Sequence, residues 1–113
     1  MREVTDPIDR RVFAELQASA GADFVVELVH TFFEEAPPML AELRAAQAAG
    51  AADRFRRAAH SLKTNAHTFG ASTLGDLARA LELGALPADA RGIDVLQVEY
   101  DTAVVALKAL IHG

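Results

Sequence analysis

The chain has 113 residues, of which 51% are hydrophobic, and it has a formal net charge of −5. This length fits one domain over residues 1–113 with a single core, and the acidic balance argues against nucleic acid as the main partner, because phosphate contacts need clustered lysine and arginine. The chain contains no cysteine, which excludes a disulfide framework, a thiol nucleophile and a thiolate metal site.

The stretch Thr5-Asp6-Pro7 predicts the start of a short first helix. Asp6 is suited to cap the free amides of this helix, and Pro7 is suited to its first position, where the missing N–H costs nothing. A short apolar stripe follows and fades by Gly21; its members are Ile8, Val12, Phe13 and Leu16. We expect this helix to cover one end of a bundle.

A second helical pattern runs from about Asp23 to Gln47 and contains two adjacent prolines, Pro37 and Pro38. An interior proline removes a backbone hydrogen bond and typically costs about 3 kcal/mol, so one interpretation is two separate helices. The other is a single kinked helix, which we favour because the apolar pattern resumes after the prolines. Gly50 is expected to end this helix. Its apolar residues are Phe24, Val25, Leu28, Phe32, Met39, Leu40 and Leu43.

The third helix, predicted from about Asp53 to Phe69, is strongly amphipathic. Successive side chains of a helix are rotated by about 100°, which places the apolar residues of this segment on one stripe. The stripe consists of Phe55, Ala58, Ala59, Leu62, Ala66 and Phe69. Polar side chains lie on the opposite side, away from the expected core, and the most reactive of them is His60. They are Arg56, His60, Lys63, Thr64 and His67.

Two further helices are predicted after Gly70, which tolerates the left-handed conformation that closes a helix. Ser72 is a suitable cap for the first of them, which should end near Gly84. The last helix covers about residues 93–111 and follows an irregular segment. Four long helices with short connections predict an all-α fold: an antiparallel up-down-up-down four-helix bundle with a short extra N-terminal helix.

The third helix and the turn after it contain a short motif. It reads, in order, His60, Ser61, Leu62 and Lys63, then small residues, and then Phe69, Gly70 and Ala71. With two alanines before the histidine, this motif resembles the signature of histidine-containing phosphotransfer (HPt) domains. The order and length of the helices resemble that family over most of the chain. One position departs from the pattern, because Thr64 stands where the family usually has glycine.

The resemblance implies that His60 is a phosphoacceptor. Free imidazole has a pKa of about 6.5, so a neutral nucleophile is abundant at physiological pH, and a ring nitrogen can attack a phosphoryl group to form a phosphoramidate. Lys63, one turn later, is placed to stabilise the negative charge of the transferring group. The alternative is a solvated histidine without a role, and the surrounding motif argues against it.

Further residues are candidates for binding. His67 lies about 10 Å from His60 along the helix, too far to share a metal ion, so we expect it to be a solvated residue or a docking contact. The resemblance also places a polar residue of the next helix, here Glu82, against the reactive imidazole; the alternative is an ordinary solvated glutamate. The expected binding residues are Arg56, Thr64, His67, Phe69, Gly70, Ala71 and Glu82.

The resemblance implies two kinds of partner, a response-regulator receiver domain and a sensor or hybrid histidine kinase. Mg²⁺ would belong to the receiver domain, and we expect no cofactor or metal site in this chain. The expected role is a stoichiometric phosphotransfer intermediate and not an enzyme, since the chain has no Gly-rich nucleotide loop. The alternative function is a non-catalytic helical docking module that binds receiver or kinase domains.

The sequence also bears on where the protein is located and whether it assembles. The charged N-terminal segment lacks the apolar core of a signal peptide, and no apolar run has the length that spans a bilayer. We therefore expect a cytoplasmic protein that contacts neither membrane nor nucleic acid. The resemblance further implies a monomer.

Overall fold

The computed structural model describes residues 6–112, and all the regular elements in that range are α-helices. The predicted all-α class is therefore confirmed. The helices are α1 (Arg10–Ala20), α2 (Ala22–Ala49), α3 (Ala52–Thr68), α4 (Ser72–Leu83) and α5 (Arg91–His112).

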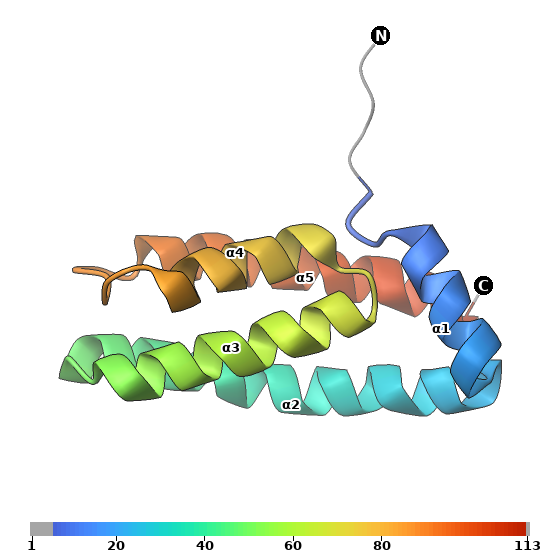
Figure 1. The fold of residues 1–113 in the computed structure, drawn as a ribbon, viewed down its shortest axis with the longest axis horizontal. Coiled ribbons are helices and arrows are strands. Elements are labelled where there is room, and N and C mark those ends of the chain that lie inside the picture. The colour runs from blue at the N-terminus through green and yellow to red at the C-terminus, as the bar shows by residue number, and fades with distance from the viewer. Residues whose placement is uncertain (1–5, 113) are drawn as a thin grey trace, which may run out of the picture.

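Helices α2 to α5 lie along the long axis of the molecule, and α1 crosses one end of them (Figure 1). The colour gradient shows that successive helices from α2 to α5 run in alternating directions. Helix α3 packs against α2 and α4, and α5 packs against the same two helices. Because α3 and α5 do not contact each other within the described residues, they occupy opposite corners of the bundle.

Helix α1 begins at Arg10 and not at Pro7, so the predicted start was wrong by about one turn. The N-cap is Asp9, whose carboxylate accepts hydrogen bonds from two backbone N–H groups of the first turn. The carboxylate of Asp6 instead accepts from a backbone N–H two residues later and from the Arg10 side chain. The sequence holds two aspartates that can cap a helix, and the later one does so. Thr5 lies outside the described residues.

Helix α2 continues through Pro37 and Pro38 without a break, as the favoured interpretation predicted. Both proline side chains are exposed, while the core face of α2 stays buried before and after them. Burial of a leucine or phenylalanine stabilises by about 1.5–3 kcal/mol, so this face offsets the cost of the prolines. Gly50 ends the helix in the left-handed conformation. Phe24, predicted on the apolar stripe, is 51% exposed because its neighbour Val25 takes the core position.

The core face of α3 forms the centre of the bundle. Its apolar residues are all buried, and the alanines among them allow α2 and α4 to lie close. From α2, the ring of Phe32 packs against Phe69 at 5.4 Å and against Tyr100 of α5 at 5.7 Å between centroids. Aromatic pairs at these separations add to the stability that burial provides. Because one face of α3 is fixed in this core, the opposite face is held toward solvent.

The turn between α3 and α4 is anchored on α1. The carbonyl oxygen of Gly70 accepts a hydrogen bond from the Asp9 N–H at 2.7 Å, and a Cβ at Gly70 would lie 2.7 Å from the Asp9 carbonyl oxygen. With a φ of 80°, this position requires glycine. The prediction that Ser72 caps α4 was wrong. Ser72 is the first residue of α4, and the N-cap is Ala71, which makes no side-chain hydrogen bond.

Candidate functional site

His60 lies near the middle of α3, on the face opposite the core. The residue before it, Ala59, and Leu62 two positions later are completely buried, which fixes the rotation of the helix about its axis. The His60 side chain is 58% exposed. An exposed ring on a rigid helix is accessible to a second protein while its backbone keeps one orientation.

Glu82, near the end of α4, connects His60 with Lys63. Its Oε2 lies 2.7 Å from Nδ1 of His60, and its Oε1 lies 2.8 Å from Nζ of Lys63. The Glu82 side chain is only 15% exposed, and Oε1 is buried with the lysine ammonium as its one polar partner among the described residues. The contact between Glu82 and the imidazole, expected from the resemblance, is thus present in the structure.

These contacts determine the charge of the carboxylate. The Lys63 ammonium, and to a smaller extent the bond to His60, lower the pKa of Glu82 below its ordinary value of 4.5. An ionised carboxylate only accepts hydrogen bonds, so Nδ1 of His60 carries the proton that it donates to Glu82. In the neutral imidazole, the lone pair then lies on Nε2.

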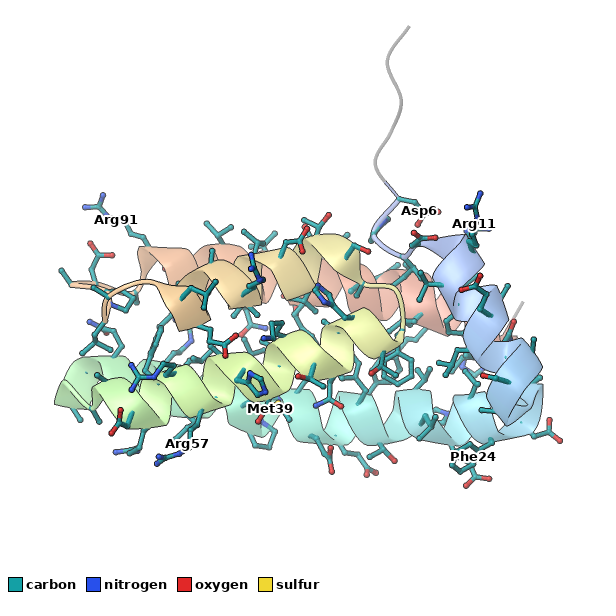
Figure 2. All side chains as sticks on the ribbon, in the orientation of Figure 1. Asp6, Arg11, Phe24, Met39, Arg57 and Arg91 are labelled. Atoms are coloured by element: carbon teal, nitrogen blue, oxygen red, sulfur yellow. The ribbon has the colours of Figure 1, made fainter. Side chains whose placement is uncertain are left out.

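A shallow groove runs beside the imidazole; it is lined by Arg56, Arg57, His60, Ser61 and Glu82. A second groove lies between α2 and α3, and Arg57 and Ser61 line both. Figure 2 shows Arg57 projecting outward from α3. The sequence analysis selected Arg56 and missed Arg57, although its position one turn before His60 on the same helix was a usable signal.

Arg56 forms an ion pair with Asp53 on the exposed surface of α3. Arg57 makes no ion pair within the described part of the chain; its charge helps to lower the pKa of Glu42, which pairs with Arg54. The face around His60 therefore carries positive charge from α3, although the chain as a whole is acidic. Such a face attracts an anion more strongly at low ionic strength.

His67 contacts α4 and not the His60 groove. Its Nε2 lies 3.4 Å from Oδ1 of Asp76, and its ring occupies the space that a Cβ at Gly75 would need. Gly75 precedes Glu82 by as many residues as His60 precedes His67, and α3 and α4 run in opposite directions (Figure 1). The two contacts therefore belong to one register: the close approach at Gly75 aligns α4 so that Glu82 reaches His60.

The remaining predicted residues differ in exposure. Thr64 is exposed one turn after His60 on α3, and its carbonyl oxygen accepts a hydrogen bond from the Thr68 hydroxyl. Three of the expected binding residues are buried, because they close the turn to α4 and pack against α1 and α2. These are Phe69, Gly70 and Ala71, and they act by holding α3 in place.

The described residues contain neither a cluster of metal ligands nor a membrane span. Nowhere between residues 6 and 112 do three or more histidine, cysteine, aspartate or glutamate side chains gather as a metal site would require. None of the helices in the same range has the length and apolar character needed to cross a membrane.

Comparison with known protein families identifies a match. The family model of the Hpt domain matches residues 27–111, which is most of the chain. The matched range extends from the first turns of α2 nearly to the end of α5, and it contains His60, Lys63 and Glu82. No curated protein and no solved structure shows a significant match.

Replacing Glu82 by glutamine should reduce stability in a pH-dependent way. The lowered pKa of Glu82 means that its ionised form stabilises the folded state above the ordinary carboxyl value, and that this contribution disappears as the pH falls through the folded-state pKa. Urea denaturation of wild type and Glu82→Gln should therefore show a larger difference in free energy of unfolding at about pH 7 than at about pH 3.

The matched control for this measurement is Glu35→Gln, which changes an exposed glutamate of α2 that makes no ion pair within residues 6–112. It should change the free energy of unfolding little at either pH. An equal loss of stability at both pH values in Glu82→Gln would contradict the electrostatic role of this carboxylate.

Proposed function

The chain belongs to the Hpt domain family, and we propose that its His60 accepts a phosphoryl group from the phospho-aspartate of a receiver domain and passes it to an aspartate of another. Members of this family act in two-component phosphorelays as histidine phosphotransfer intermediates and not as classical enzymes. The observation that supports His60 most strongly is its position, exposed on α3 with Nδ1 held by the ionised Glu82.

The orientation of the ring favours one nitrogen as the nucleophile. Because Nδ1 donates its proton to Glu82, the lone pair of the neutral ring is on Nε2. The carboxylate also stabilises the positive charge that the imidazole gains when Nε2 forms a bond. Glu82 is in this proposal a positioning residue, since it acts through the ring and not on the phosphoryl group.

The transfer itself exchanges one bond for another. The Nε2 lone pair forms the N–P bond while the O–P bond of the aspartyl phosphate breaks, and the aspartate leaves as a carboxylate with the electron pair. The proton on Nδ1 stays in the hydrogen bond to Glu82. Onward transfer is the reverse step, in which the carboxylate of a second receiver domain attacks phosphorus and Nε2 leaves as the neutral ring.

Positive charge around His60 supports this step. The transferring group spreads negative charge over its equatorial oxygens, so catalysis rests mainly on positioning and electrostatics. Lys63 lies one turn after His60 and contacts Glu82, while Arg56 and Arg57 lie about one turn before His60 and line the groove beside the imidazole. The carboxylate keeps Lys63 near the imidazole, and we assign Lys63 to stabilising the phosphoryl oxygens.

The docking partner in this proposal is a receiver domain, which would supply the Mg²⁺ as well as the phospho-aspartate. It would cover the exposed face of α3, including Thr64, and the groove between α2 and α3. A sensor or hybrid histidine kinase would stand upstream in the relay. The antiparallel up-down-up-down bundle and a cytoplasmic location are part of the same proposal.

His60→Gln should abolish phosphoryl acceptance and leave the fold intact, because the side chain lies outside the core. Wild type and variant are incubated with a phosphorylated receiver domain and Mg²⁺, and intact mass and acid lability are recorded. One acid-labile phosphoryl group is expected on wild type and none on the variant, with unchanged helicity by circular dichroism.

His67→Gln is the control in the same assay, and it should still be phosphorylated. Phosphorylation of His60→Gln would place the acceptor elsewhere and contradict the proposal. A folded wild type that binds several receiver domains and takes phosphate from none of them would support the non-catalytic docking module instead.

Lys63→Ala should slow the transfer by about tenfold without abolishing it, since loss of one charge-stabilising group raises the barrier but leaves the nucleophile in place. Single-turnover rates are measured by rapid quench at low and high salt. Arg11→Ala removes the same charge at the distant end of the molecule (Figure 2) and should leave the rate nearly unchanged. Equal rates for Lys63→Ala and wild type at low salt would exclude the electrostatic role.

A further inference from the structure

Helix α5 is apolar on its outer face as well as on its core face. The large hydrophobic side chains that are exposed in residues 6–112 include three valines of α5, namely Val95 at 54%, Val98 at 66% and Val105 at 70%. Nothing in the described bundle covers this face, since α5 packs only on α2 and α4.

The exposed residues have the spacing of a helix–helix contact. Val95, Val98, Thr102, Val105 and Ala109 recur at intervals of three and four residues, which is the pattern of one side of a two-helix coiled coil. Thr102 fits this row because its hydroxyl donates to the Val98 carbonyl oxygen at 3.0 Å, so the polar atom is already bonded. We call these five residues the α5 stripe.

We propose that the α5 stripe is the interface of a homodimer, in which α5 of one copy packs antiparallel on α5 of a second. The charged residues beside the stripe favour a second copy of this chain as the partner. Asp101 and Lys108 lie two turns apart on the same flank of the stripe, and both line the groove that contains Phe33 and Val104. A twofold axis between Ala103 and Val104 places Asp101 of each copy beside Lys108 of its partner, which gives two reciprocal ion pairs.

Other pairings of two α5 helices bring like charges together. An antiparallel register shifted by one heptad, centred at Tyr100, places Asp101 beside Asp101 of the second copy. A parallel pairing places Asp94 beside Glu99 of the second copy, because in a parallel two-helix coiled coil a residue that flanks the stripe lies beside the residue five positions later in the partner helix. The complementary register also sets Val98 opposite Ala109 and Thr102 opposite Val105, so that the central residues of the stripe meet one another.

The expected dimer is reversible. One pair of helices over the length of the stripe buries less surface than the roughly 1,200–2,000 Å² of a stable interface, so we expect micromolar dissociation constants. The inference is independent of phosphotransfer and replaces the monomer that the resemblance implied. Because α3 and α5 occupy opposite corners of the bundle, His60 stays accessible in both copies.

Sedimentation equilibrium of the full chain tests the interface. Wild type should change from monomer to dimer as its concentration rises, and Val105→Glu should remain monomeric with unchanged helicity, since a glutamate on an exposed helix face is compatible with folding. Phe24→Glu, which changes an exposed apolar residue of α2, should dimerise as wild type does. A monomeric wild type at concentrations up to about 1 mM would overturn the proposal, as would a dimer that persists in Val105→Glu.

Charge reversal tests the register. Asp101→Lys and Lys108→Asp should each weaken the dimer by about tenfold, because each change replaces two attractive contacts by two repulsive ones. The double variant Asp101→Lys, Lys108→Asp should recover the affinity of wild type. An unchanged dimer in Asp101→Lys would indicate the shifted register, in which residue 101 lies beside residue 101 of the second copy and the repulsion only changes sign. Failure of the double variant to recover would contradict antiparallel pairing. Either result would overturn the arrangement proposed here.

Discussion

The site depends on the carboxylate of Glu82, which binds His60 with one oxygen and Lys63 with the other. A single side chain from α4 thereby fixes an imidazole and an ammonium group that lie one turn apart on α3. Glutamine, with one acceptor oxygen, has no second oxygen to offer the lysine. The ionised carboxylate also determines the tautomer of the imidazole, and so it determines which nitrogen of the neutral ring carries the lone pair. The orientation and the tautomer of the His60 ring thus have one origin.

This contact is made possible by the packing of α3 against α4. The ring of His67 lies where a side chain at residue 75 would stand, so the two helices approach closely only because that residue is glycine. The same register brings Glu82 level with His60. On the other side of α3, buried alanines and the aromatic contacts around Phe32 prevent the helix from rotating about its axis. The bundle supplies a rigid support, and the proposed site occupies the solvent face of α3.

Much of this was predictable from sequence, because helical periodicity reports which side of a helix is buried. The apolar stripe of α3 placed His60 and Lys63 outside the core, and the continued pattern around Pro37 and Pro38 indicated one helix. Where two residues had similar local propensity, the sequence did not decide: Asp9, not Asp6, caps α1, and Val25, not Phe24, faces the core. Other features depend on the distances between helices, which the pattern of one helix does not report. These are the contact of Glu82 with Lys63, the packing of His67 against Gly75 and the burial of Phe69.

The role proposed for Glu82 is tested most directly by identifying the nitrogen of His60 that carries phosphorus. Protein labelled with ¹⁵N on histidine is phosphorylated by a receiver domain, and ring nitrogens are assigned from long-range ¹H–¹⁵N correlations with coupling to ³¹P. Because Glu82 holds Nδ1, the coupled nitrogen should be Nε2 of His60, with Nδ1 still protonated. Phosphorus on Nδ1, or on another histidine, would contradict the role assigned to this carboxylate.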